Sequence, residues 1–207
     1  MAVTLEIDHL VVAADRLADG VAYVEQSLGL RMQPGGKHPD MGTHNALLNL
    51  GPIYLEVIAI DPNAPAPDHP RWFNLDHFSG PPRLTNWVAR TDDLDAAIAL
   101  APPGIGTRRD LRRGDLNWSM VVPGDGLLPY DQAFPGLIQW HGDAHPLQRL
   151  AEPQCRMEML QIAHPDPEDL RDALNLFDGR LGALVGQADQ TSFRAAITTM
   201  SGLKVLT

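Results

Sequence analysis

Two polar side chains of this sequence lie where proteins place catalytic or metal-binding groups. His9 lies in the strand-like run 5–13. Glu56 lies in the run 53–60, which is otherwise almost wholly apolar. A carboxylate within a buried strand is costly unless it is paired, protonated or bound to a metal. Glu56 is therefore the strongest single indication of chemistry, either as a metal ligand or as a general base.

His44 and Asn45, which enter the strand-like run 45–50, are the next candidates. An imidazole there can bind a metal, polarise a carbonyl or carry a proton. We therefore expect His44 to be a third ligand or an acid–base partner of Glu56, and Asn45 to bind substrate. The alternative is that this polar pair only caps the preceding loop. His38, by contrast, is expected on a surface loop.

The later part of the chain adds candidates for binding a ligand. Trp118 and Trp140 lie on strand-like runs and can form an aromatic wall, although such tryptophans are more often plain core. His141 follows Trp140 at the end of a strand, and with Asn86 it completes the set of substrate-binding candidates. His145 is a weaker candidate at the pocket mouth.

These candidates lie on two copies of one unit. The strand around His9 and the helical pattern after Asp15 recur 77 residues later, around Asn86 and after Asp92. Each copy continues with further strand-like runs, which gives the order β-α-β-β-β. One sheet face of such a unit is covered by its helix, so two units bury their open faces against each other and leave a concave pocket. The alternative is that the similarity of the two segments is due to chance, since a strand followed by a helix is common in proteins that contain both.

The predicted fold class is therefore α+β. Two tandem βαβββ modules pair into a half-open barrel around a pocket, and a C-terminal helix and β-hairpin follow. In the second module the strong strand-like runs are 116–122 and 156–162, with a shorter one at 137–140. The expected divisions are 1–62 for the first module, 63–83 for a proline-rich connector, 84–165 for the second module with an insertion near 123–153, and 166–207 for the C-terminal helix and hairpin.

Charge and composition exclude several kinds of partner. With 16 Lys and Arg against 26 Asp and Glu, the net charge is -10, so we expect no nucleic-acid binding. Four arginines in the run 108–113 could hold an anion, but such a run is more often a solvated loop or strand edge. No segment is long and apolar enough for a membrane span, and the N-terminus has no signal-peptide pattern. We therefore expect a cytoplasmic protein without a membrane partner.

Several segments resemble the glyoxalase-like domain of the vicinal oxygen chelate (glyoxalase/bleomycin resistance/dioxygenase) superfamily. The clearest are Asp8-His9-Leu-Val-Val-Ala, Gly35-Gly-Lys-His-Pro-Asp-Met-Gly-Thr-His-Asn and Tyr54-Leu-Glu-Val-Ile-Ala. The resemblance spans about residues 1–165. It implies the paired fold, a small-molecule ligand and frequent homodimers. It does not specify the activity, because this superfamily includes lyases, isomerases, dioxygenases, resistance transferases and metal-free binding proteins.

The resemblance also implies a divalent metal, held by a His on the first strand and a Glu on the fourth. His9 and Glu56 occupy these positions, and such ligands suit Zn²⁺, Mn²⁺, Fe²⁺ or Ni²⁺. The second copy departs from the pattern, because Asn86 is the residue that corresponds to His9 in the repeat, and an asparagine is a poor metal ligand. Either His44 or His141 completes the site, or the pocket is metal-free.

The sequence leaves three functions open. The first is a metal-assisted lyase, isomerase or dioxygenase acting on a small oxygenated organic molecule. The second is an enzyme without a metal that uses Glu56 and His44 as an acid–base pair. The third is a metal-free protein that binds or sequesters a small molecule. Asn86 favours the last two, whereas the buried setting of Glu56 favours an enzyme.

Overall fold

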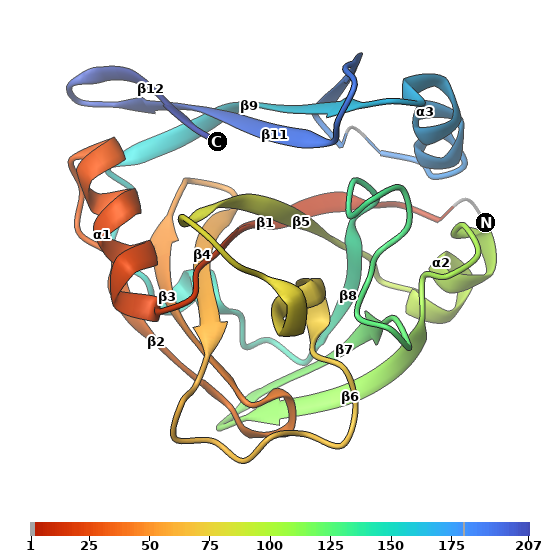
Figure 1. Cartoon of the computed structure of the whole chain (residues 1–207), viewed down its shortest axis with the longest axis horizontal. Coiled ribbons are helices and arrows are strands. Elements are labelled where there is room, and N and C mark those ends of the chain that lie inside the picture. The colour runs from red at the N-terminus through yellow and green to blue at the C-terminus, as the bar shows by residue number, and fades with distance from the viewer. Residues whose placement is uncertain (1–2, 180) are drawn as a thin grey trace.

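The chain folds into two β-sheets in a computed structural model that describes residues 3–179 and 181–207 (Figure 1). The α-helices and strands are β1 (Glu6–Ala13), α1 (Leu17–Leu28), β2 (Gln33–His38), β3 (Thr43–Asn49), β4 (Tyr54–Ile60), β5 (Arg83–Arg90), α2 (Leu94–Leu100), β6 (Thr107–Arg113), β7 (Leu116–Val122), β8 (Gly136–His141), β9 (Cys155–His164), α3 (Pro167–Asn175), β10 (Ala183–Gln187), β11 (Ser192–Thr199) and β12 (Gly202–Leu206). The larger sheet has the order β2-β3-β4-β1-β5-β8-β7-β6 and curls on itself, while β10-β9-β11-β12 forms a smaller sheet above β1 and β5.

The larger sheet is built from two βαβββ units that meet at β1 and β5. These strands pair antiparallel, and Leu10 lies directly opposite Trp87. The two residues are 77 positions apart, which is the offset of the sequence repeat, so the pseudo-twofold axis between the units passes between them. This pairing confirms the predicted α+β fold with two joined βαβββ units.

The helices begin slightly later than their acidic residues suggest. Asp15 precedes the expected first helix but does not cap it, because α1 begins at Leu17 and the Asp15 carboxylate accepts a hydrogen bond from the Gly80 backbone instead. In the second unit Asp93 caps α2 through its side chain. Gly29 ends α1 in the left-handed conformation, with φ 71°, as a C-cap glycine does.

One strand predicted for the second unit belongs to the smaller sheet. The run 156–162 forms most of β9, which pairs with β10 and β11. The fourth strand of the second unit is instead β8, the shorter run. Apolar alternation indicates a half-buried strand but does not say which sheet it joins. The arginine-rich run forms β6, an edge strand, and the predicted C-terminal helix and hairpin are α3 and β11–β12.

The proline-rich connector folds against the larger sheet. Within its proline-free stretch 71–80, Trp72–His77 forms a 3₁₀ turn (η2), with Phe73 and Asn74 at φ 56° and 52°. Positive φ is uncommon for residues other than glycine. Trp72 and Phe73 are both buried, so this connector supplies part of the interior rather than only a link.

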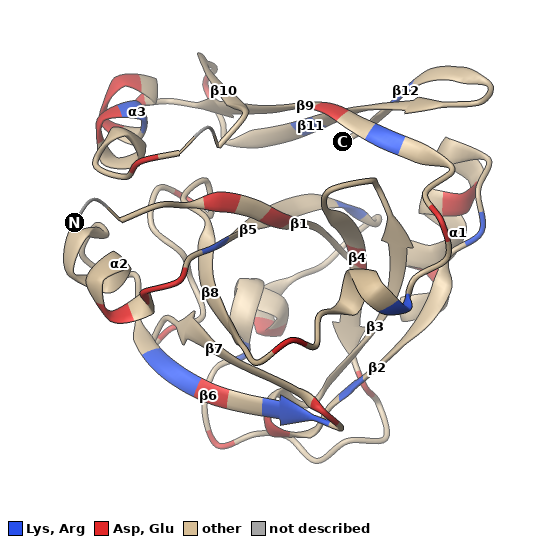
Figure 2. Ribbon diagram, turned by 180° about the vertical axis from the view of Figure 1, so that it is seen from behind, with Lys and Arg blue, Asp and Glu red and all other residues tan. Residues whose placement is uncertain are grey.

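The two sheets share one hydrophobic core, which includes side chains from β1, β5, β9 and β11. None of the helices in the described part of the chain is long and apolar enough to cross a bilayer. Basic residues gather along β6 (Figure 2), where Arg108 forms ion pairs with Asp95 and Asp110.

Candidate functional site

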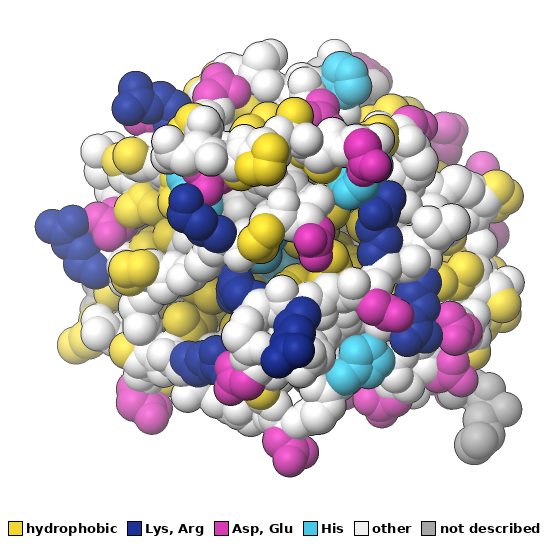
Figure 3. Space-filling model, turned by 90° about the horizontal axis from the view of Figure 1, so that it is seen from below, with side chains coloured by type: hydrophobic (Ala, Val, Ile, Leu, Met, Phe, Trp, Pro, Cys, Tyr) yellow, Lys and Arg dark blue, Asp and Glu magenta, His cyan; other side chains and the backbone are white. Residues whose placement is uncertain are grey.

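A cavity that is partly open to solvent lies inside the curl of the larger sheet. Every strand of that sheet except β5 contributes a lining side chain. Seen from below, hydrophobic and histidine side chains lie in a central hollow, with charged groups around it (Figure 3). The polar lining side chains are His9, His38, Asn45, Tyr54, Glu56 and Arg113.

Glu56 lines the cavity, and its two carboxylate oxygens have different surroundings. Its Oε1 accepts a short hydrogen bond from Asn45 Nδ2. Its Oε2 lies 3.6 Å from His9 Nε2. Glu56 and His9 are 6% and 4% exposed, so water solvates neither group well. Adjacent parallel strands place them, because Glu56 on β4 is paired with Val11 on β1, two residues beyond His9.

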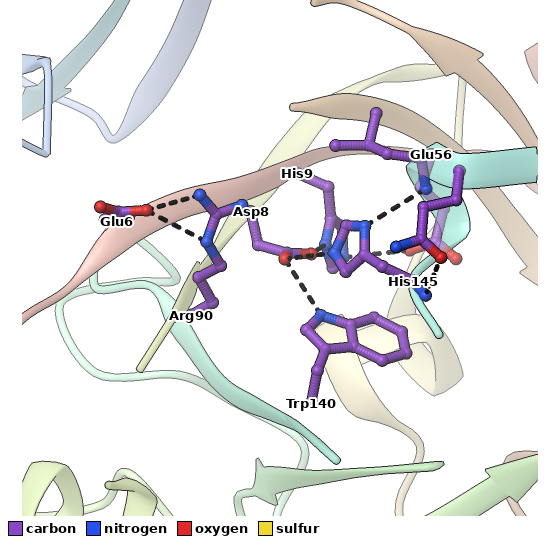
Figure 4. A network of polar contacts seen from close by, with 9 residues as sticks. Glu6, Asp8, His9, Glu56, Arg90, Trp140 and His145 are labelled. Atoms are coloured by element: carbon purple, nitrogen blue, oxygen red, sulfur yellow. Dashed lines mark hydrogen bonds and ion pairs between the residues drawn. The ribbon is translucent and has the colours of Figure 1, made fainter. Parts of the chain in front are cut away.

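A β-bulge brings Asp8 into the same network. Ile7 pairs with Ala89 and His9 pairs with Val88, so Asp8 is an extra residue in β1. Its fully buried carboxylate accepts hydrogen bonds from His9 Nδ1 at 2.6 Å, Trp140 Nε1 at 3.0 Å and His145 Nε2 at 3.1 Å (Figure 4). Three donors therefore compensate one buried negative charge.

The protonation of this network follows from its contacts. Burial alone would raise the pKa of Asp8, but hydrogen bonds from His145 and His9 outweigh it and hold that pKa well below its usual range. Asp8 therefore stays ionised and fixes the Nδ1 proton of His9 toward itself. The Tyr54 ring stacks on the His9 ring at a centroid distance of 4.5 Å. Burial and the charges of Asp8 and Glu56 raise the pKa of Tyr54 well above its usual value, so its hydroxyl stays neutral.

A second bulge, in β2, places the amide of Asn45. Gly35 and Gly36 together face Asn45, because Pro34 pairs with Ala46 and Lys37 pairs with His44. The Gly36 backbone N–H donates to Asn45 Oδ1 at 2.7 Å, which turns Asn45 Nδ2 toward the Glu56 carboxylate.

Five of the predicted site residues line one cavity. They are His9, Asn45, Glu56, Trp118 and Trp140. The rings of Trp118 and Trp140 lie 5.5 Å apart and form the expected aromatic wall on β7 and β8. Trp140 also donates to Asp8, a polar role that the sequence did not indicate.

Three other predicted residues do not line it. His44 alternates with Asn45 on β3, which directs its side chain to the opposite face of the sheet. Asn86 is fully buried, and its Nδ2 donates to Gln132 Oε1 instead of facing the cavity. His141 lies within 2.6 Å of the Ser119 hydroxyl, on the face of β8 opposite Trp140.

Several groups of the site were not predicted from the sequence. His38 is 8% exposed and lines the cavity, so its placement on a surface loop was wrong. Tyr54 precedes Glu56 by two residues, so strand alternation alone could have placed it on the same face. Asp8 requires the bulge, and Arg113 requires the closure of the barrel. Neither of these features has a signal in the sequence.

The donor set does not fit a resident metal ion. Within the described part of the chain, no group of three or more His, Cys, Asp or Glu is arranged to hold one. His9 and Glu56 are close enough to share an ion, and Asp8 supports His9 as an outer carboxylate supports a metal-bound histidine. The second unit supplies no further donor at the equivalent positions. Asn86, which corresponds to His9, is hydrogen-bonded to Gln132, and Gly136 corresponds to Glu56. Two protein donors fall short of the three usual in a catalytic zinc site.

The curled sheet of two βαβββ units and its internal polar pocket define a glyoxalase-type protein. A family model described as "Glyoxalase-like domain" matches residues 7–176, and the chain belongs to this family. It therefore belongs to the vicinal oxygen chelate superfamily, as its sequence resemblance implied. A search of curated proteins returns no match.

Solved structures that are similar to this chain have low sequence identity to it. A hypothetical protein from Staphylococcus aureus is 13% identical, with a TM-score of 0.62, over 97% of this chain and 98% of that chain. Methylmalonyl-CoA epimerase from Mycobacterium tuberculosis is 19% identical, with a TM-score of 0.41, over 67% and 89% of the two chains. A variant of the Streptomyces coelicolor methylmalonyl-CoA epimerase, in complex with 2-nitronate-propionyl-CoA, is 17% identical, with a TM-score of 0.43, over 69% of this chain and 100% of that chain. At this similarity the epimerases inform neither the substrate nor the mechanism of this chain.

Proposed function

We propose that this protein is an enzyme that removes a proton from carbon in a small oxygenated organic molecule, with Glu56 as the base. The observation that carries the proposal is the asymmetric setting of the Glu56 carboxylate. Asn45 fixes one oxygen, while the other accepts no hydrogen bond from the described residues and lies 3.6 Å from His9 Nε2. A positioned carboxylate shielded from water is suited to take a proton from a bound substrate.

His9 supplies the complementary acid in this proposal. Ionised Asp8 holds the Nδ1 proton of His9 and would stabilise an imidazolium, as the buried carboxylate of a catalytic triad does. As an imidazolium, with a proton on each nitrogen, His9 can donate from Nε2 to the substrate oxygen on which negative charge develops and so act as the acid. Loss of a proton next to a carbonyl begins both isomerisation and elimination, which are two of the reaction classes expected from the sequence.

A metal-assisted reaction is a second candidate, favoured by the 3.6 Å approach of His9 to Glu56 and by the support of Asp8. The donor set argues against it. Elemental analysis of untagged protein separates the two, because a resident metal would be near-stoichiometric in the wild type and absent from a His9→Ala, Glu56→Ala double variant.

Exchange of substrate hydrogen for deuterium tests the proposal without knowledge of the complete reaction. Wild-type protein in D₂O would be mixed with a panel of 2-oxo acids, 3-oxo acids and their amides, and loss of the C–H signal would be followed by proton NMR. We expect exchange with at least one compound, unchanged by a chelator. Binding of a compound without exchange would instead indicate a sequestration protein. Exchange that a chelator removes and a divalent metal restores would favour the metal-assisted reaction.

A further inference from the structure

Arg113 brings a positive charge to this pocket without a carboxylate to neutralise it. The side chain lines the cavity from the end of β6. Its Nη1 lies 2.9 Å from His38 Nε2 and 3.4 Å from Asn45 Oδ1. Within the described part of the chain, no acidic side chain forms an ion pair with Arg113, and its Nε and Nη2 have no hydrogen-bond partner.

The two groups that hold Arg113 are neutral. Burial and the positive charge of Arg113 lower the pKa of His38 to about 3, so His38 is uncharged near neutral pH. Its Nδ1 lies 3.0 Å from the Thr43 hydroxyl, which leaves Nε2 to accept from Arg113. A neutral imidazole and a neutral amide orient the guanidinium but leave its charge for a ligand.

The backbone of β2 is shaped around this guanidinium. A Cβ atom on Gly36 would lie 2.8 Å from Arg113 Cδ and 3.0 Å from Nε. The absence of a side chain at Gly36 therefore allows β2 and β6, the two edges of the curled sheet, to approach each other around Arg113. Trp118 and Trp140 form an aromatic wall of the same cavity.

We propose that the pocket binds an aromatic carboxylic acid, with the carboxylate on Arg113 and the ring against Trp118 and Trp140. Guanidinium and carboxylate form paired, charge-assisted hydrogen bonds, and Nε and Nη2 present one such pair of donors. The proposal deepens the proposed function, because it names the substrate class of the same site. Asn45 contacts both Arg113 and Glu56, so the proposed carboxylate site and the proposed base belong to one cluster of side chains in the same cavity.

Matched acid and amide ligands test the inference on the unaltered protein. Benzoate and benzamide, phenylacetate and phenylacetamide, and 3-phenylpropanoate and 3-phenylpropanamide would be titrated by calorimetry at pH 7. We expect at least one acid to bind at least about tenfold more tightly than its amide, since an amide forfeits the charge-assisted contact. Equal affinities, or no binding of any acid at millimolar concentration, would overturn the proposal.

Neighbouring arginines provide a matched pair of variants. Arg113→Gln removes the charge in the pocket, whereas Arg112→Gln removes an exposed charge one residue away on the same strand. We expect Arg113→Gln to abolish the preference for the acid, Arg113→Lys to retain part of it, and Arg112→Gln to leave it intact. Equal loss in both glutamine variants would mean that overall charge, not the pocket, sets the preference. Binding that survives in the absence of any deuterium exchange would contradict the proposed function but not this inference.

Discussion

Asp8 determines what His9 can do in this site. The imidazole lies between an ionised carboxylate on its Nδ1 side and Glu56 on its Nε2 side. An imidazole oriented in this way has one nitrogen committed to the protein and the other free for the substrate. The same residue type on the other face of β3, His44, has no such support within the described residues. The number of histidines near a predicted site is therefore a poor guide to which of them acts.

His38 should make stability depend on pH. Its pKa is about 3 in the folded protein, against about 6.5 when exposed. As pH falls below about 6.5, the unfolded chain binds a proton that the folded chain does not, so the free energy of unfolding falls toward pH 3. Between pH 7 and pH 5 we expect a loss of about 2 kcal/mol from this residue, measured by urea denaturation. His38→Gln should flatten the dependence, while replacement of exposed His77 should not.

At the scale of elements, two bulges build the site. The bulge in β1 turns Asp8 toward its neighbour His9, and the bulge in β2 sets two glycines against Asn45. Regular pairing would put consecutive side chains on opposite faces of the sheet, so Asp8 and His9 could not share a network. The catalytic geometry that we propose thus depends on irregularities in otherwise regular strands.

Gly35→Ala should disrupt this arrangement. A Cβ at this position would lie 2.0 Å from Asn45 Oδ1 and 2.8 Å from the Asn45 carbonyl oxygen, so the bulge would have to shift. We expect a loss of about 1–3 kcal/mol of stability, as for other overpacked sites, and a loss of deuterium exchange. Gly186→Ala in β10 is the control, because a Cβ there meets nothing within 4 Å. Equal stability and activity of the two variants would refute this role of the β2 bulge.

The sequence predicted what depends on periodicity and missed what depends on register. The repeat, the two βαβββ units and the buried setting of Glu56 follow from patterns within a strand or at a fixed offset, whereas the family resemblance implied that His9 is the partner of Glu56. Arg113 could not be told from Arg112, because only the meeting of β2 and β6 decides which one enters the cavity. The placement of β9 failed for the same reason, since an alternating strand pairs equally well in either sheet.

At the scale of the whole molecule, the smaller sheet is expected to unfold together with the larger one. Ile197 on β11 is fully buried in the core that both sheets share. Ile197→Ala should lower the free energy of unfolding by about 2–5 kcal/mol. All four tryptophans of the chain precede the smaller sheet in sequence, so their fluorescence reports on the rest of the molecule. The fluorescence and far-UV circular dichroism transitions should shift together, whereas a fluorescence transition that does not move would show that the sheets unfold independently.

Glu56 is the base of the proposed reaction, and deuterium exchange by two variants can test this role. Glu56→Gln keeps the shape of the side chain and an oxygen for Asn45 but removes its capacity to take a proton. With a compound that the wild type exchanges, we expect Glu56→Gln to lower the rate at least about 100-fold while affinity for that compound persists. His44→Gln, outside the cavity, should leave the rate unchanged. Exchange that survives in Glu56→Gln, or that disappears instead in His44→Gln, would contradict the account.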